Sequence, residues 1–223
     1  MQFLYHEAAG EPQVILEGDP YRYLFKVRRF RIDETIVMRN MQDGIAYGYR
    51  ITSIDRRRAT LVLESRKSYD VVPKRRLHLG WCVVDPKTVE KALPALNEIG
   101  VGKITFIDCR YSQRHFKIDE RRLKTILINS SQQCGRTRLM EFAHCSDLAS
   151  FIDAHPEAYL LDFADEPLRT HRQRIETLVI GSEGGLSDEE RGLFPKERIV
   201  GLDSRLILRS ETAACASASI LLL

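Results

Sequence analysis

The stretch TLVIGSEGGLSDEE, residues 177–190, combines the end of an apolar strand, a glycine-rich loop and the start of an acidic helix. Ser187, followed three residues later by Glu190, predicts a capping box at the helix start. The loop lacks the Gly-Lys-Ser/Thr of a P-loop and the G-x-G-x-x-G spacing of a dinucleotide site. Its glycines allow positive φ and a close approach of a ligand to the backbone; alternatively, the loop is only a tight turn. Because the first helical turn is acidic, we expect a neutral or cationic ligand rather than a phosphate.

Strands and helices alternate around this loop from Leu77 to the last residue. The pattern predicts strands at 77–84, 103–109, 138–143, 158–163, 176–181 and 198–202, and helices at 86–99, 119–133, 146–153 and 211–223. Such alternation is typical of an α/β domain with a mainly parallel sheet. Ligands in such sheets bind beyond the carboxyl ends of the strands.

The first third of the chain has a different pattern. Short segments rich in β-branched residues, at 34–40, 45–54 and 59–65, predict a small β-barrel. Pro73 interrupts regular structure where the pattern changes, so we expect a first domain at 1–72 and a second at 73–223. Residues 1–76 hold 15 Lys and Arg against 10 Asp and Glu, which favours a nucleic-acid partner or, alternatively, a solvated basic face.

Composition restricts the class of protein further. The sequence contains no run of eighteen apolar residues, so it predicts no membrane span. Its first residues do not resemble a signal peptide. The five cysteines are scattered and the six histidines show no ligand spacing, so we expect reduced thiols, a cytoplasmic protein and no metal site.

A second motif, SRLILRSETAA at residues 204–214, precedes the apolar final helix. VIGSEGGLSDEE followed by LILRSETAA resembles the 16S ribosomal RNA uridine-N3 methyltransferase family (RsmE), of the SPOUT class. The segments YLFKVRR, LNEIGVGKI, YSQRHF and QQCGRTRL carry the same resemblance, which covers nearly the whole chain. The sequence departs from the family where Ser182 replaces a proline and Gln132 a glutamate. The first arginine of the second motif is replaced by Leu206 or displaced to Arg205.

The resemblance implies a PUA-like N-terminal β-barrel that binds RNA and a C-terminal SPOUT domain with a deep trefoil knot. It implies S-adenosylmethionine as cofactor and N3 of a uridine in the decoding region of 16S rRNA as target. It implies 16S rRNA or the assembled small ribosomal subunit as partner. It also implies a homodimer with the site at the subunit interface; burial of the apolar final helix within one subunit is the alternative to dimerisation. The cofactor-binding residues that it implies are Leu161, Asp162, Phe163, Gly181, Glu183, Gly184, Gly185, Gly201, Leu202, Leu206, Leu208 and Thr212.

The chemistry of N3 methylation sets two requirements. Uridine N3 loses a proton, and a nearby arginine would stabilise the anion that remains. Arg209 and Glu211 are the candidates for stabilising the anion and accepting the proton. The alternative for this pair is a salt bridge that shapes the loop, with helix capping at 210–211. The candidate RNA contacts are Arg28, Arg29, Arg110, Arg114, Lys117, Arg136 and Arg138, and the candidate stacking residues are Tyr111, His115 and Phe116.

Two other functions stay open from the sequence. The same fold could methylate a ribose 2′-OH. The departures at Gln132, Ser182 and Leu206 also suit a non-catalytic RNA-binding or ribosome-assembly factor with a vestigial pocket.

Overall fold

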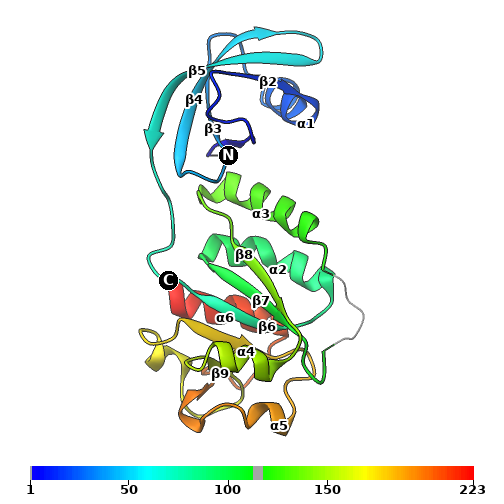
Figure 1. Ribbon diagram of the computed structural model, residues 1–223, viewed down its shortest axis with the longest axis vertical. Helices are drawn as coiled ribbons and strands as arrows, with labels where there is room; N and C mark the ends of the chain where they lie inside the picture. Colours follow the sequence, from blue (N-terminus) through cyan, green and yellow to red (C-terminus); the bar gives the residue numbers. More distant parts are fainter. Residues whose placement is uncertain (1, 113–117) are drawn as a thin grey trace. The chain divides into compact units, whose positions relative to one another are not determined.

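The computed structural model describes residues 2–112 and 118–223, which form two compact units (Figure 1). The first unit contains Met1–Val72 and Ile128–Leu139, and the second contains Pro73–Leu127 and Met140–Leu223. The chain therefore leaves the first unit after Val72 and returns to it within helix α3 (Glu120–Cys134). The inclusion of residues 128–139 in the first unit differs from the division expected from the sequence.

A curled five-stranded sheet forms the first unit. Its strands are β1 (Leu4–Tyr5), β2 (Gln13–Glu17), β3 (Thr35–Arg39), β4 (Ile45–Ile54) and β5 (Arg58–Ser68), in the order β1-β3-β4-β5-β2. Register shifts after Gly48 and after Ile51 bend the long β4–β5 hairpin, as bulges do. Among the described residues β1 and β2 are the two edges, so the sheet is a half-barrel, more open than the small β-barrel expected.

Alternate residues of these strands point into one core. Leu16, Met38, Tyr49 and Leu61 are completely buried there. The short helix α1 (Gly18–Tyr21) and the π-helix Arg22–Val27 contribute further apolar side chains, including the fully buried Leu24.

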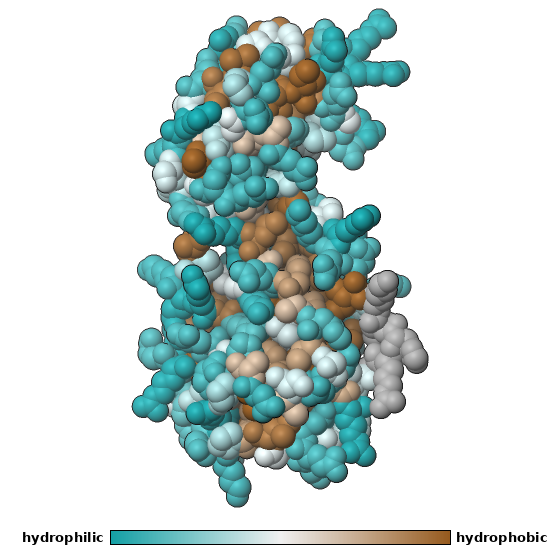
Figure 2. All heavy atoms as spheres, viewed as in Figure 1, coloured by the Kyte–Doolittle hydropathy of each residue, from teal (hydrophilic) through white to brown (hydrophobic). Residues whose placement is uncertain are grey.

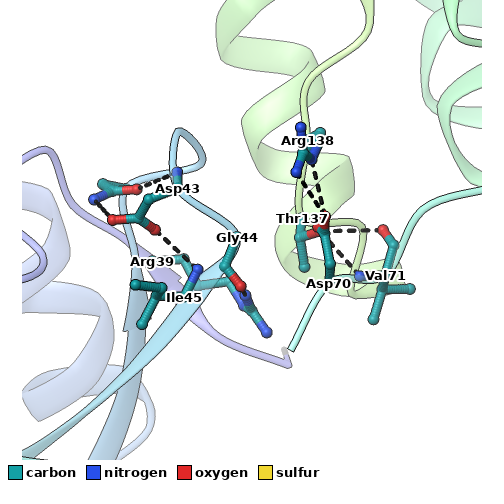
Figure 3. A network of polar contacts seen from close by, with 9 residues as sticks. Arg39, Asp43, Gly44, Ile45, Asp70, Val71, Thr137 and Arg138 are labelled. Atoms are coloured by element: carbon teal, nitrogen blue, oxygen red, sulfur yellow. Dashed lines mark hydrogen bonds and ion pairs between the residues drawn. The ribbon is translucent and has the colours of Figure 1, made fainter. Parts of the chain in front are cut away.

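A polar network explains why residues 128–139 belong to the first unit (Figure 3). The Thr137 amide donates to the Val71 carbonyl (3.1 Å), and the Val71 amide donates to Thr137 Oγ1 (3.0 Å). Arg138 forms an ion pair with Asp70 (2.8 Å), to which the Thr137 hydroxyl also donates. The hydrogen bonds from Thr137 and Arg138 lower the pKa of Asp70, so its carboxylate is charged at neutral pH.

The second unit contains a six-stranded sheet in which every strand runs parallel to its neighbours. The strands are β6 (His78–Cys82), β7 (Lys103–Ile107), β8 (Glu141–Cys145), β9 (Tyr159–Leu161), β10 (Thr177–Ile180) and β11 (Ile199–Val200), in the order β11-β9-β10-β6-β7-β8. All six overlap predicted strands, and the expected α/β architecture with a parallel sheet is confirmed.

Helices cover both faces of this sheet. A Cβ atom on Gly80 would lie 2.8 Å from Phe151 of α4 (Leu148–Ala154), whereas the next residue, Trp81, bonds to Ser210 of α6 (Ser210–Leu222). Since successive strand residues point to opposite faces, α4 and α6 lie on opposite sides of the sheet. Helix α2 (Pro86–Ile99) packs against α6 (Figure 1).

The helix boundaries follow the sequence signals. Asp85 caps α2 by accepting from the Lys87 amide (2.7 Å), and Gly100, at φ 112°, ends the helix. The capping box of Ser187 and Glu190 is confirmed at α5 (Asp188–Arg191). All five cysteines are free, and within residues 2–112 and 118–223 there is no helix with the length and apolar character of a membrane span.

Candidate active site

The register of the parallel sheet brings three of the predicted cofactor segments to one level. Leu161 of β9 is aligned with Ile180 of β10 on one side and with Val200 of β11 on the other. Each is the last residue of its strand. The residues that follow, Asp162, Gly181 and Gly201, therefore start at the same edge of the sheet.

The glycine loop after β10 is a tight turn. The Gly185 amide donates to the Ser182 carbonyl (3.0 Å), and Gly185 has φ +70°. No described atom lies within 4 Å of the place where a Cβ on Gly185 would stand, so this side of the loop is open. On its other side the loop packs against Tyr111, whose Cβ would be 3.0 Å from a Cβ on Gly184.

Ser182 is accommodated in the loop by polar contacts that a proline would not make. Its side chain is buried, and Oγ can donate to the Tyr111 carbonyl (3.2 Å) or the Gly185 carbonyl (3.4 Å). Below it, contact with Cys109 together with burial raises the pKa of Cys82, so this thiol is uncharged. Cys82 is fully buried and belongs to the apolar core of the second unit.

The segment after β9 is fixed by one backbone bond and one ion pair. The Asp162 amide donates to the Val200 carbonyl (2.9 Å), and the Asp162 carboxylate pairs with Arg191 of α5. Phe163 follows with 73 % of its surface exposed. An aromatic side chain in solvent at this edge is available to a ligand or to another protein surface.

Gly201 allows two backbone segments to approach very closely. Its amide donates to the Glu166 carbonyl and its carbonyl accepts from the Leu168 amide, both at 2.8 Å. A Cβ at this position would lie 2.2 Å from the Ala164 carbonyl oxygen, so only glycine fits without displacement of the backbone.

A cavity of about 470 Å³ opens beside this contact. It is lined by Ala164, Asp165, Pro167, Gly201, Leu202, Asp203, Ser204 and Arg205. The sequence predicted Gly201 and Leu202 and missed the residues on either side of them, for which the isolated loops carry no motif. Arg205, the possible replacement for the family's first arginine, lies in the cavity wall.

The second motif leaves its apolar residues in solvent. Leu206 and Ile207 are 76 % and 82 % exposed, Leu208 is half-buried, and Arg209 and Thr212 are exposed. Arg209 is the N-cap residue of α6 but makes no side-chain cap, and within the described residues no ion pair joins it to Glu211. The salt-bridge alternative for this pair is therefore not found, and the guanidinium of Arg209 is open to solvent.

The predicted RNA contacts have different environments. Arg28 and Arg29 are exposed in the first unit. Arg110 pairs with Glu189 (2.9 Å), and Arg138 pairs with Asp70 as described above. Arg136 is only 7 % exposed, and its Nε donates to the Arg138 carbonyl (2.8 Å), so little of it is left to contact a phosphate. The predicted residues Arg114, His115, Phe116 and Lys117 lie outside the described residues.

Comparisons with known proteins identify the family. A family model described as an RNA methyltransferase domain matches residues 72–222, and one described as an RNA methyltransferase PUA domain matches residues 16–64. The chain is 37 % identical over 223 residues to the Ribosomal RNA small subunit methyltransferase E of Helicobacter pylori, covering 99 % of both chains. The chain belongs to this methyltransferase family.

Solved structures agree with this assignment at the level of the fold. The family member from Neisseria gonorrhoeae, solved bound to S-adenosyl methionine, superposes with a TM-score of 0.78 at 21 % identity, covering 98 % of this chain and 95 % of that one. A methyltransferase from Legionella pneumophila, solved with bound SAM, gives a TM-score of 0.79 at 24 % identity over 99 % and 96 % of the two chains.

Among residues 2–112 and 118–223, no group of three His, Cys, Asp or Glu side chains could hold a metal ion.

The close contact at Gly201 gives a first prediction. Gly201→Ala forces the Ala164 segment to move and should lower the free energy of unfolding by about 2 to 3 kcal/mol. Gly102→Ala is the matched control, because its Cβ would meet the Leu77 carbonyl at an ordinary 3.4 Å. Urea titration of both variants measures the difference, and equal stabilities would contradict the geometry.

Proposed function

We propose that this protein is a cytoplasmic S-adenosylmethionine-dependent enzyme that methylates N3 of a uridine in 16S rRNA, on the RNA alone or in the small ribosomal subunit. The observation that carries the proposal is the similarity to Ribosomal RNA small subunit methyltransferase E over the whole chain. The geometry at the carboxyl edge of the parallel sheet gives independent support.

The residues at this edge suit the cofactor. Gly185 leaves open space at positive φ, where a ligand can lie against the backbone. Asp165 and Asp203 line the cavity; the carboxylate of Asp165 would suit a positively charged sulfonium, whereas that of Asp203 pairs with Arg169 (3.0 Å). Leu161, Asp162, Phe163, Gly181, Glu183, Gly184, Gly185, Gly201, Leu202, Leu206, Leu208 and Thr212 remain the proposed binding residues. Bound there, S-adenosylmethionine would supply an electrophilic methyl group.

The chain path in the second unit supports a deep trefoil knot, which we include in the proposal. Strand β11 lies at the edge of the sheet beside β9, whereas the following helix α6 packs against α2 and β10. Residues 202–209 must therefore carry the chain from the edge strand β11 back toward the central strands of the sheet. Threading α6 through the preceding loops would follow this path, and true knots are otherwise rare.

Arg209 and Glu211 are the proposed catalytic residues. Removal of the imide proton from N3 leaves an anion, and a fixed guanidinium beside it lowers the cost of forming that anion. Arg209 is exposed and in no ion pair among the described residues, so its charge is available to a substrate. Glu211, in the first turn of α6, is half-exposed, so its carboxylate would be available to accept the proton directly or through a water.

RNA binding is proposed for both units. The exposed guanidinium groups of Arg28 and Arg29 suit phosphate contacts in a PUA-like domain, and Arg110, Arg114, Lys117 and Arg138 would add contacts in the rest of the chain. Arg110 and Arg138 would exchange a carboxylate partner for a phosphate. Arg136, being buried, would act by holding residue 138 in place.

We also propose a homodimer, although the evidence is not the apolar final helix that the sequence suggested. Helix α6 buries Ala214, Ala218 and Leu221 within one chain, so its apolar surface is largely covered without a partner. Phe163, Leu206 and Ile207, in segments that we assign to the proposed site, are among the apolar side chains that stay exposed. Hydrophobic patches also interrupt the mainly hydrophilic face in Figure 2. An apolar group beside the proposed site suits a partner subunit.

Light scattering tests the dimer. Ile207→Glu places a charge in the exposed apolar group and should shift the protein from about twice the mass of one chain toward the monomer at micromolar concentration. Val27→Glu, at another exposed apolar position, in the first unit, should leave the mass unchanged. A wild-type monomer would rule the dimer out.

Calorimetry with S-adenosylmethionine tests the glycine loop. Gly185→Ala adds a methyl group where the backbone is open and should weaken binding roughly tenfold or more. Gly18→Ala is matched, because Gly18 also has positive φ and no described atom within 4 Å of its Cβ position. Both variants should lose about 1 to 2 kcal/mol of stability from the left-handed backbone. Equal affinities would remove the loop from the cofactor site.

Product analysis tests the reaction. Nucleosides from rRNA treated with the wild-type enzyme should contain N3-methyluridine, and Arg209→Ala should slow its formation by roughly a hundredfold. Arg174→Ala is the control. Arg174 is exposed on the segment that precedes β10, at the amino ends of the strands and away from the proposed site. Methyl groups on the ribose would instead indicate a 2′-O-methyltransferase, and RNA binding without any methylation would indicate an assembly factor.

A further inference from the structure

A buried chain of two hydrogen bonds connects three segments of the second unit. Trp81 Nε1, in β6, donates to Ser210 Oγ (2.8 Å), and Ser210 Oγ donates to the Gly181 carbonyl (2.6 Å). Trp81 is fully buried and Ser210 is 5 % exposed, so water cannot readily take over either bond.

The Ser210 hydroxyl does not serve its own helix. A serine at a helix start usually accepts a bond from an amide of the first turn. Here the N-cap of α6 is Arg209. The Ser210 hydroxyl accepts a hydrogen bond from the Trp81 indole and donates one to the Gly181 carbonyl. It is therefore a bridge between the end of β10 and the start of α6.

This bridge lies between two segments of the proposed cofactor site. Gly181 is the first residue of the glycine loop, and Ser210 directly follows the exposed residues 206–209. The hydrogen bond from Ser210 at 2.6 Å fixes the direction of the Gly181 carbonyl. It therefore also fixes the direction in which the chain enters the glycine loop. One hydroxyl thus determines the spacing of the two segments.

We propose that Ser210, oriented by Trp81, is a positioning residue that holds the glycine loop and residues 206–209 at the spacing needed to bind S-adenosylmethionine. The inference rests on the proposed function, because it concerns the affinity of that site. Ser210 acts through the backbone of Gly181 and needs no contact with the cofactor.

The experiment compares four forms of the full chain by calorimetry with S-adenosylmethionine. Ser210→Ala removes both bonds and should weaken binding roughly tenfold, as expected for the loss of one well-formed buried interaction. Ser210→Thr keeps the hydroxyl and should restore most of the affinity. Ser217→Ala is the matched control. Ser217 is a buried serine of the same helix whose Oγ has no hydrogen-bond partner among the described residues, so its variant should bind as the wild type does.

Trp81 is the only tryptophan in the chain, so its fluorescence reports on the bridge without any activity measurement. Ser210→Ala leaves the indole N–H without its acceptor and should shift the emission to shorter wavelength, whereas Ser217→Ala should not. If Ser210→Ala fails to fold, Ser210→Cys keeps a similar volume with a weaker donor and acceptor, and the same loss of affinity is expected.

The outcomes separate this inference from the proposed function. Cofactor binding by the wild type and equal binding by Ser210→Ala, or by Ser210→Cys in its place, would overturn the positioning role alone. A loss of affinity that Ser210→Thr does not reverse would also overturn it. A wild-type protein that binds no S-adenosylmethionine would overturn the proposed function and this inference with it.

Discussion

The parallel register of β9, β10 and β11 is the constraint on which the candidate site depends. It ends three strands at Leu161, Ile180 and Val200 on one level, so the segments that follow start side by side although they are far apart in sequence. A parallel strand needs a long return connection, and here each return also supplies part of the site. The proposed site residues therefore gather at the carboxyl ends of these strands.

Two kinds of contact keep these segments in place. Backbone contacts at Gly201 are so close that a methyl group cannot be inserted without displacing the Ala164 segment. Side-chain contacts then join one segment to the next: Asp162 pairs with Arg191, and Ser182 bonds to the carbonyl of Tyr111. Exposed apolar and cationic side chains, such as Ile207 and Arg209, remain in the segment 206–209.

The sequence predicted what depends on local patterns. Asp85 and Gly100 mark the ends of α2, and Ser187 with Glu190 marks the start of α5, because caps involve residues close in the chain. Strands β1 and β2 were missed because they are short edge strands stabilised by distant partners. The Ser210 bridge was missed for a related reason. A serine before an alanine-rich helix suggests a cap, and only the fold shows that its hydroxyl bonds to Trp81 and Gly181.

The discontinuous first unit has a consequence for the order in which the protein is made. Its sheet is complete once residue 72 has been synthesised, but the Asp70 network needs Thr137 and Arg138, and the amides of Gln2 and of Tyr5 in β1 donate to Gln132. A nascent chain that has reached only Val72 would expose these polar groups to water. The first unit therefore acquires its final contacts only after more than sixty further residues have left the ribosome, when much of the second unit is still unmade.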